Sequence, residues 1–276
     1  MEPSRPIVLD PHGASSTPVS FDLDAYCARI HYTGPRDVSA ATLQGLHVAH
    51  THAVPFENLD IHLGRPLSLD PPDLFAKIVT RHRGRYCYEL NGGFALLLQA
   101  LGFQVQGLLA RVLYGAETPL PRTHQLLLVT VGDEAWMADV GFGRQSLRAP
   151  VRLTPGVVEQ QGPDTFRLQR DVGQVFCLEK VLEGHWQDLY AFTLEPFLPV
   201  DYLPFNHWHS TSPRSQFTQR KICTMPTATG RIVAVDWELK IRTQEVTETI
   251  QATTLPEYLH LLHEYFGLAI EGAFIR

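Results

Sequence analysis

The sequence predicts an α+β protein of 276 residues, built from a helical region, a β-rich region and a smaller mixed region in that order. Apolar residues at helical spacing dominate residues 21–102, and Val- and Leu-rich runs separated by turn signals follow from 103. A Pro-rich link at 195–204 then leads to a strand pair and a last helix in 205–276. Residues 1–20, which contain Pro, Ser and Gly, are interpreted as a flexible extension.

Four helices are predicted in the first region. The first runs from Asp22 to Tyr32, Ser39 caps the second, and Asp70-Pro71 begins the third. The fourth runs from Cys87 to Leu101, and Gly102 is its natural C-terminal stop. Their inward positions are Leu23, Tyr26, Ile30, Leu43, Leu46, Val54, Leu74, Ile78, Val79, Phe94, Leu97, Leu98 and Leu101. These residues predict a helical bundle.

The second region is predicted to be antiparallel β structure, either a barrel or a sandwich. Its expected strands are 105–114, 125–131, 135–140, 166–168, 175–181 and 186–192. The third region has expected strands at 232–237 and 239–243. In the last helix, Thr254 and Glu257 form a capping box.

Composition excludes several classes of function. The net charge is −6, from 23 basic and 29 acidic residues without a long run of one sign, so nucleic-acid and anionic-membrane binding are not expected. No apolar run has transmembrane length, and the N-terminus lacks the apolar core of a secretory signal. Four separated cysteines without a CxxC motif argue against a disulfide framework and fit a reducing cytoplasm.

Cys87 is the candidate nucleophile. It follows the basic stretch Arg83-Gly84-Arg85 and lies at the predicted start of a helix. The helix dipole and free N–H groups favour negative charge there, so a cysteine at this position tends toward the reactive thiolate. The alternative is a small buried residue that only packs. Core packing is the expectation for Cys27 and Cys177, and Cys223 is expected to be a surface or partly buried thiol, with a role in a substrate cleft as the alternative.

Two downstream residues complete a possible catalytic group. His124 lies 37 residues after Cys87, where a loop enters a strand, and an imidazole there would take the thiol proton. Asp139 lies 15 residues further, at the end of the next expected strand and before Gly141 and Gly143. If the strands are neighbours, Asp139 orients His124 as in a catalytic triad. The alternatives are a strand-edge histidine and a turn aspartate.

Other motifs are weaker. His47, His50 and His52 do not share one helix face, and no HExxH is present, so no metal site is predicted. Gly141-x-Gly143 lacks the third glycine of a dinucleotide fingerprint.

Several separated segments together resemble the arylamine N-acetyltransferase family over about residues 21–270. The matching segments are Phe21-Asp22-Leu23-Asp24-Ala25-Tyr26, Arg29-Ile30 with Tyr32-Thr33-Gly34, Val54-Pro55-Phe56-Glu57-Asn58-Leu59, Arg83-Gly84-x-Tyr86-Cys87-Tyr88-Glu89-x-Asn91, Asp139-Val140-Gly141-Phe142-Gly143 and Thr211-Ser212-Pro213-x-Ser215-x-Phe217. The resemblance implies a helical bundle, a β-barrel and an α/β lid, with a catalytic core similar to that of papain-like proteases and transglutaminases.

The resemblance also implies an activity: acetyl transfer from acetyl-CoA, through a cysteine thioester, to arylamines, arylhydrazines or N-hydroxyarylamines in a ping-pong cycle. The Cys-His-Asp triad of the family corresponds to Cys87, His124 and Asp139. The family's acceptor-lining positions correspond to Phe56 and Phe142, and positions near CoA or the acyl group correspond to Thr123, Gly143 and Ser212.

Two positions depart from the family pattern. Arg85 stands where the family usually has glycine, and it is expected either to alter the loop or to help a CoA phosphate or the thiolate. Gly93 replaces a larger apolar residue inside a helix, which costs about 1 kcal/mol relative to Ala. The rival functions are a thiol hydrolase, a transglutaminase or an amide synthase with the same triad, and a ligand-binding protein without catalysis.

Overall fold

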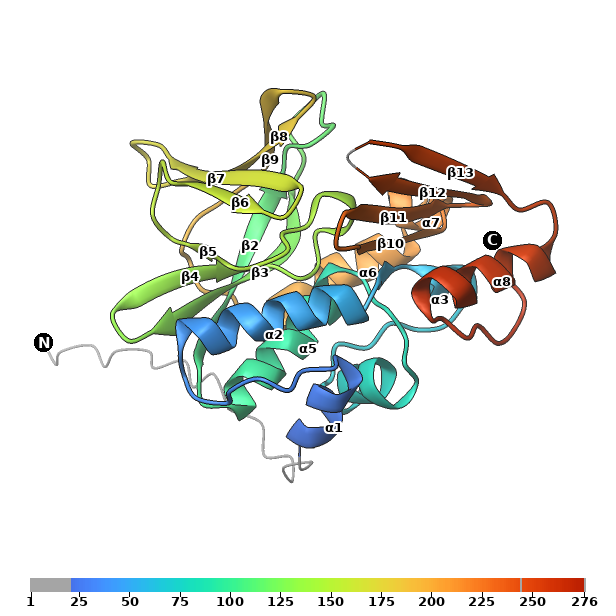
Figure 1. The fold of residues 1–276 in the computed structure, drawn as a ribbon, viewed down its shortest axis with the longest axis horizontal. Coiled ribbons are helices and arrows are strands. Elements are labelled where there is room, and N and C mark those ends of the chain that lie inside the picture. Colours follow the sequence, from blue (N-terminus) through green and yellow to red (C-terminus); the bar gives the residue numbers. More distant parts are fainter. Residues whose placement is uncertain (1–20, 244, 276) are drawn as a thin grey trace, which may run out of the picture.

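A computed structural model describes residues 21–243 and 245–275 of the chain. The predicted extension at 1–20 lies outside the described residues. Helices dominate the part up to residue 100, two antiparallel sheets follow, and a long helix precedes the C-terminus (Figure 1). The predicted α+β class is confirmed.

The first part forms a bundle of mostly short helices. They are α1 (Leu23–Arg29), α2 (Ala40–Ala53), α3 (Leu59–His62), α4 (Pro71–Phe75) and α5 (Cys87–Ala100). Asp22 and Ser39 cap α1 and α2, since their side chains accept from Ala25 N and Thr42 N. Asp70 and Pro71 occupy the N-cap and the first turn of α4 as predicted, although the Asp70 side chain makes no capping hydrogen bond. After one turn α4 widens into a π-helix, η1 (Ala76–Thr80).

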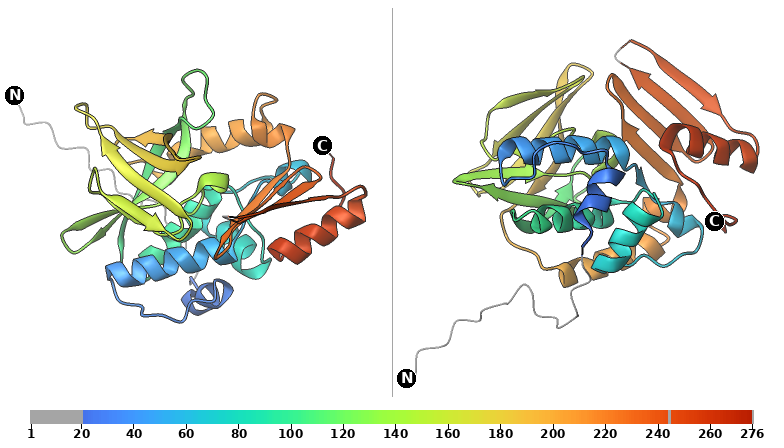
Figure 2. Two further views of the ribbon diagram at one scale, coloured as in Figure 1. Left: turned by 45° about the horizontal axis from the view of Figure 1, so that its top comes forward. Right: turned by 60° about the horizontal axis from the view of Figure 1, so that its bottom comes forward.

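Eight strands form the larger sheet, in the order β5-β4-β3-β2-β9-β8-β7-β6 with every pair antiparallel. The strands are β2 (Gln104–Val112), β3 (Arg122–Val131), β4 (Glu134–Ala138), β5 (Val151–Arg152), β6 (Val158–Gln161), β7 (Asp164–Arg170), β8 (Phe176–Leu182) and β9 (His185–Phe192). The sheet curls into a nearly closed barrel (Figures 1 and 2), so the barrel alternative is the correct one. The 3-10 helix η2 (Gly143–Gln145) lies between β4 and β5.

The second sheet, which we call the lid sheet, has the order β1-β10-β11-β12-β13. Its strands are β1 (Phe56–Glu57), β10 (Ile222–Pro226), β11 (Gly230–Val235), β12 (Glu238–Thr243) and β13 (Thr247–Gln251), and α8 (Leu255–Phe266) packs on it. The connection from the barrel contains η3 (Pro199–Tyr202), α6 (Leu203–Thr211) and α7 (Gln216–Gln219). Two features cross the predicted division: β1 comes from the bundle, and α6 spans the boundary at 204 and 205. The division therefore stays a prediction.

Two of the strands that the sequence missed are short or polar. Strand β1 has two residues, and β6 carries Glu159, Gln160 and Gln161 among its four. The backbone groups of β1 are satisfied by a partner far along the chain, in the pairing of Phe56 with Thr224. Hydrophobic periodicity does not report such partners.

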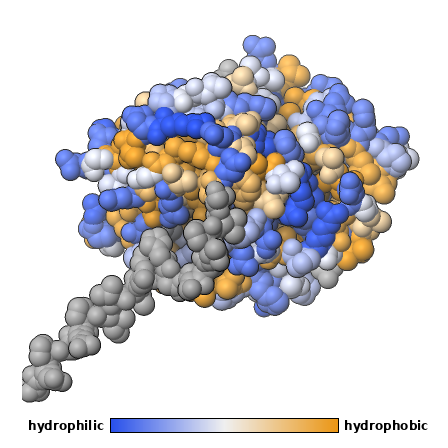
Figure 3. Space-filling model, turned by 90° about the horizontal axis from the view of Figure 1, so that it is seen from below, coloured by the Kyte–Doolittle hydropathy of each residue, from blue (hydrophilic) through white to orange (hydrophobic). Residues whose placement is uncertain are grey.

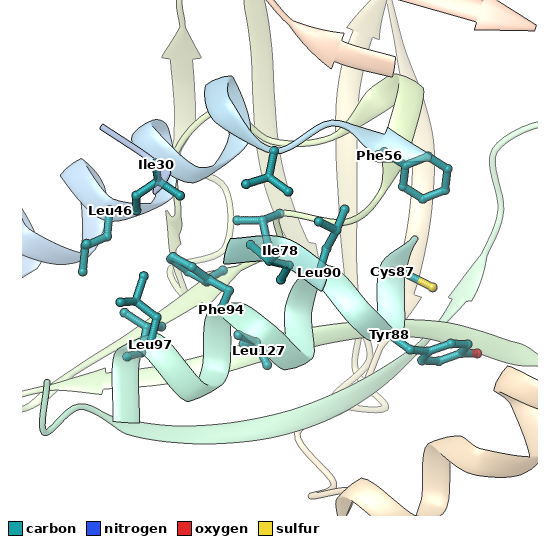
Figure 4. Packing of buried hydrophobic residues seen from close by; sticks show 14 of the residues in the cluster. Ile30, Leu46, Phe56, Ile78, Cys87, Tyr88, Leu90, Phe94, Leu97 and Leu127 are labelled. Carbon is teal, nitrogen blue, oxygen red and sulfur yellow. The ribbon is translucent and has the colours of Figure 1, made fainter. Parts of the chain in front are cut away.

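Helix α5 is the central element for the site. It packs against α1 and α4 on one side and against β2 and β3 on the other. Its apolar residues Leu90, Phe94 and Leu97 are fully buried (Figure 4). Gly93 allows this packing, because a Cβ there would lie 2.4 Å from Ile78 Cδ1.

In the described ranges, no helix has both the length and the apolar character needed to cross a bilayer. On the face shown in Figure 3, hydrophobic and hydrophilic residues are interspersed.

Candidate active site

Cys87 is the first residue of α5. The preceding residue, Tyr86, occupies the N-cap position with an extended backbone and no side-chain capping bond. The N-terminal end of the helix dipole therefore acts on the thiol without a competing cap. Cys87 is 4% exposed, and Figure 4 shows it at the end of α5 below Phe56, away from Phe94 and Leu97.

His124 and Asp139 come together because β3 and β4 are antiparallel neighbours. The pairing of Leu127 with Ala138 brings the residue after β4 beside the start of β3. His124 Nε2 lies 2.7 Å from Asp139 Oδ2, and both residues are buried. The hydrogen bond through Nε2 leaves Nδ1 of His124 for the thiol of Cys87.

Four donors surround the carboxylate of Asp139. Besides His124, Oδ2 accepts from the Tyr190 hydroxyl at 2.9 Å, while Oδ1 accepts from Asn91 Nδ2 at 3.0 Å and from Gly141 N at 2.9 Å. Burial raises the pKa of Asp139, but the His124 charge and these donors outweigh burial and hold the pKa below its usual value. Asp139 is therefore a fixed negative charge.

The imidazole of His124 responds to that charge. Burial alone lowers its pKa, but the charge of Asp139, their hydrogen bond and a hydrogen bond to Cys87 raise the pKa to about 10. A base with this preference for the protonated form stabilises an imidazolium beside a thiolate. The structure thus brings the three predicted residues together, from α5, β3 and the end of β4.

Sequence reasoning missed the residues that hold this group. Asn91 lies one turn after Cys87 on α5; it donates to Gln125 O as well as to Asp139 Oδ1, and it accepts from Val140 N. The i, i+4 spacing from Cys87 was the available signal, since such residues share one helix face. Tyr190, which comes from β9, had no comparable signal in the sequence.

The loop after Asp139 approaches the nucleophile closely. A Cβ at Gly141 would lie 2.9 Å from Cys87 Cα and 2.8 Å from Asn91 Nδ2. Gly143 has a φ of +75°, which favours glycine. These glycines let the loop lie against the start of α5.

Aromatic rings surround the triad. The Phe142 ring lies 4.9 Å from the His124 ring and 4.7 Å from the Tyr190 ring, between centroids. The Phe56 ring packs against Gly143 and lies 6.0 Å from Phe217. Both predicted acceptor residues therefore border the loop that carries Asp139.

The three positions expected near CoA lie in different settings. Thr123 adjoins His124, and its carbonyl accepts from the Tyr88 hydroxyl at 2.5 Å. Gly143 begins η2 and contacts Phe56. Ser212 ends α6, and its carbonyl accepts from Thr218 Oγ1 in the turn to α7. Only the first two adjoin the triad directly.

The other cysteines, Cys27, Cys177 and Cys223, are also free thiols. Cys27 is buried and Cys177 is half-buried. The prediction for Cys223 is wrong: it is fully buried on β10 under α8, and burial raises its pKa well above the usual value.

The histidines of α2 have structural partners. His47 Nε2 accepts from Asp139 N at 3.2 Å and its Nδ1 lies 3.2 Å from Arg148 O, while His50 contacts the Tyr26 hydroxyl. Burial lowers the pKa of His47 to about 4, so it is neutral. Among residues 21–243 and 245–275, no three His, Cys, Asp or Glu side chains form a group suited to a metal ion.

Arg85 does not face the thiol. It is 1% exposed and donates to Glu89 Oε1 at 2.6 Å and to the carbonyls of Asp73 and Leu74. The predicted contact between Arg85 and a CoA phosphate is therefore wrong, because the side chain is buried and donates to Glu89 and α4. The residue ties the loop before Cys87 to α4.

Comparisons with known proteins agree with this geometry. The family model described as N-acetyltransferase matches residues 39–275. An arylamine N-acetyltransferase / N-hydroxyarylamine O-acetyltransferase of Salmonella typhimurium is 36% identical over 90% of this chain and 89% of its own length. An arylamine N-acetyltransferase of Mycolicibacterium smegmatis is 37% identical over 91% of this chain and 93% of its own length.

Solved structures give the same answer. The arylamine N-acetyltransferase structure from Salmonella typhimurium superposes with a TM-score of 0.85 at 36% identity, covering 91% of this chain and 92% of that one. A Mycobacterium marinum enzyme in complex with CoA has a TM-score of 0.84 at 34% identity, covering 90% and 93%. The chain belongs to the arylamine N-acetyltransferase family.

Proposed function

We propose that this protein transfers an acetyl group from acetyl-CoA to an aromatic amine, through a thioester on Cys87. The observation that carries the proposal is the buried His124–Asp139 pair, 2.7 Å apart, beside a cysteine at a helix N-terminus. The CoA complex of the Mycobacterium marinum relative supports CoA as the acetyl carrier.

The first half-reaction loads the enzyme. Nδ1 of His124 takes the thiol proton, and the Cys87 thiolate attacks the acetyl carbonyl of acetyl-CoA. The C–S bond to CoA breaks, the imidazolium returns its proton to the CoA sulfur, and acetyl-Cys87 remains. The helix N-terminus stabilises the negative charge that develops at this centre.

The second half-reaction discharges it. The amine nitrogen attacks the thioester, His124 takes the amine proton, and the Cys87 thiolate leaves. Asp139 keeps Nε2 of His124 protonated, so that Nδ1 acts on the substrate side throughout. The thioester donor and thiol nucleophile exchange at little cost, and the amide product is more stable.

The acceptor class follows from the aromatic rings. Phe56 and Phe142 border the loop beside the triad and offer flat apolar surfaces to an aryl ring. Arylamines and arylhydrazines are therefore the proposed acceptors. The Salmonella typhimurium relative is also named an N-hydroxyarylamine O-acetyltransferase, which extends the proposal to N-hydroxyarylamines. A cytoplasmic location is part of the proposal, because Cys87 must stay reduced.

Intact-protein mass spectrometry tests the mechanism. Acetyl-CoA alone should add one acetyl mass to the wild type, and an arylamine should remove it as the N-acetyl product forms. Cys87→Ala should abolish the adduct, whereas Cys177→Ala, a control at a half-buried thiol on β8, should retain it. An adduct on Cys87→Ala would refute the nucleophile, and an adduct lost to water at the same rate without amine would indicate a hydrolase.

A further inference from the structure

A cationic cavity of about 240 Å³ opens where the barrel meets the lid sheet. Its lining contains one carboxylate and five basic side chains, from the η2 region, from β7 and β8, and from β11 and β12. These are Asp164 with Arg144, Arg148, Lys180, Arg231 and Arg242. Five cations against one anion leave an excess of four positive charges in the lining.

Three of these cations are buried. Arg148, Lys180 and Arg231 are 6%, 4% and 7% exposed. Asp164 pairs with both Arg148, at 2.6 Å, and Lys180, at 2.7 Å. One carboxylate thus serves two buried cations, although buried charges are costly unless they are paired.

Arg231 has only neutral acceptors. It donates to Gly143 O at 2.9 Å and to the hydroxyl and carbonyl of Ser146 at 3.1 Å each. Within the described ranges, no carboxylate forms an ion pair with it. The buried part of the cavity therefore carries two positive charges more than negative ones.

The ionisation of these groups reflects the same imbalance. Burial lowers the pKa of Lys180 to about 8, even though Asp164 raises it, and Arg231 and Arg148 lower it further. Burial also lowers the pKa of Arg231 to about 10, against the attraction of Asp164. An anion bound in the cavity would favour the charged forms of both side chains and so raise both pKa values.

Two cations at the rim remain available to a ligand. Arg144 and Arg242 are exposed, and neither side chain has an ion-pair or hydrogen-bond partner among residues 21–243 and 245–275. Arginine at such a rim gives planar, paired hydrogen bonds to phosphate oxygens.

A short segment connects the cavity to the triad. The Phe142 ring contacts the His124 ring, the carbonyl of Gly143 accepts from Arg231, and Gln145 Oε1 accepts from Lys180 at 2.9 Å. The segment 142–145 therefore contacts both the proposed base and the basic side chains of the cavity.

We propose that this cavity binds the phosphate groups of CoA, with the pantetheine arm reaching from it toward Cys87. The inference rests on the proposed function, which makes CoA the acetyl carrier. The size agrees with this role, because pockets for whole drug-sized ligands are about 300–1,000 Å³ and this one suits only the charged end of CoA. The binding is non-covalent.

Calorimetric titration with CoA tests the site without turnover. The double variant Arg144→Gln/Arg242→Gln should bind CoA at least tenfold more weakly, and added salt should weaken CoA binding more steeply in the wild type than in the variant. The control Arg81→Gln/Arg170→Gln removes the same charge from exposed arginines outside the lining and should bind CoA like the wild type. Unchanged CoA affinity in the cavity variant overturns the proposal.

A comparison of two acetyl donors distinguishes loss of the phosphate site from loss of the catalytic activity. With acetyl-CoA, the cavity variant should lose at least tenfold in kcat/KM, whereas S-acetylpantetheine, which has the thioester and arm but no phosphate, should serve both proteins equally. Equal loss with both donors overturns the phosphate site. If pyrophosphate binding depends on Arg144 and Arg242 but CoA binding does not, the cavity takes free phosphate, which also overturns it.

The two proposals fail in different ways. If CoA binding requires Arg144 and Arg242 but the wild type transfers no acetyl group, the phosphate site stands and the proposed function falls. If acetyl transfer proceeds and the cavity variant binds CoA normally, the function stands and the site falls.

Discussion

Replacing Asp139 with Asn is the most direct test of the charge beneath His124. All four groups around the carboxylate are donors: His124 Nε2–H, the Tyr190 hydroxyl, Asn91 Nδ2 and Gly141 N. An amide nitrogen at either oxygen position faces two of these donors. If it faces His124, the imidazole satisfies it only as the tautomer that presents Nδ1–H to Cys87, and this tautomer cannot accept the thiol proton.

The magnitude follows from the pKa of His124. It is about 10 in the folded protein, against an ordinary value of 6.5, a difference of about 3.5 units. Asp139 supplies the two largest of the effects that raise this pKa, its charge and its hydrogen bond, and Cys87 supplies the other two. Each pKa unit corresponds to about 1.4 kcal/mol, so the net rise is worth about 5 kcal/mol. Loss of Asp139 removes at least half of this stabilisation, and the ion pair of the imidazolium with the thiolate becomes about a hundredfold rarer or more.

Quenched-flow mass spectrometry measures this loss. The rate of acetyl-enzyme formation from acetyl-CoA at pH 7 should fall by about a hundredfold or more in Asp139→Asn. The control Tyr190→Phe removes one neutral donor, worth about 1 kcal/mol, and should stay within about tenfold of the wild type. Alkylation of Cys87 by iodoacetamide should slow in parallel. A rate for Asp139→Asn within tenfold of the wild type, or an equal loss in both variants, refutes the reasoning.

Three further outcomes concern stability. Arg85→Met leaves Glu89 with one fewer buried cation and should lower the free energy of unfolding in urea by about 3 kcal/mol. The double variant Arg85→Met/Glu89→Gln should recover part of this loss. A double variant that loses more stability than the two single variants added together would contradict the pairing. Gly93→Ala should destabilise by about 1–3 kcal/mol despite the better helix propensity of Ala, because Ile78 Cδ1 must move; a higher Tm would contradict this packing. The raised pKa of His124 contributes stability that is fully present below pH 6.5 and is lost as the pH rises through about 10. Over that range the free energy of unfolding should therefore fall more in the wild type than in His124→Gln. An equal fall with pH in both proteins would show that His124 is not the titrating group.

The parts of the site that the sequence predicted are those set by local geometry. Cys87 begins α5 because a long apolar helical pattern starts there, and Gly102 ends it with a φ of +93°. His124 and Asp139 meet because a tight turn at 132–133 makes β3 and β4 a hairpin. Each of these features depends on residues close to one another in the chain, and their types carry the information.

The parts that it missed depend on distant neighbours. Tyr190 reaches Asp139 because β9 pairs with β2, beside β3, and no local pattern reports that strand order. Arg85 looked like a cation beside the thiol, but its direction is decided by Glu89, four residues later, and by the carbonyls that end α4.

The segment from Asp139 to Arg148 makes the triad depend on all three parts of the chain. The bundle holds its first residue through Asn91 and His47, the barrel through His124 and Tyr190, and the lid sheet holds Gly143 through Arg231. At its other end the guanidinium of Arg148 donates to carbonyls at 227 and 230, where the lid sheet turns. Loss of lid packing therefore removes the contacts that hold Gly143 and Arg148, while Asp139 keeps its contacts to the bundle and the barrel. A bundle fragment alone retains Cys87 without its base.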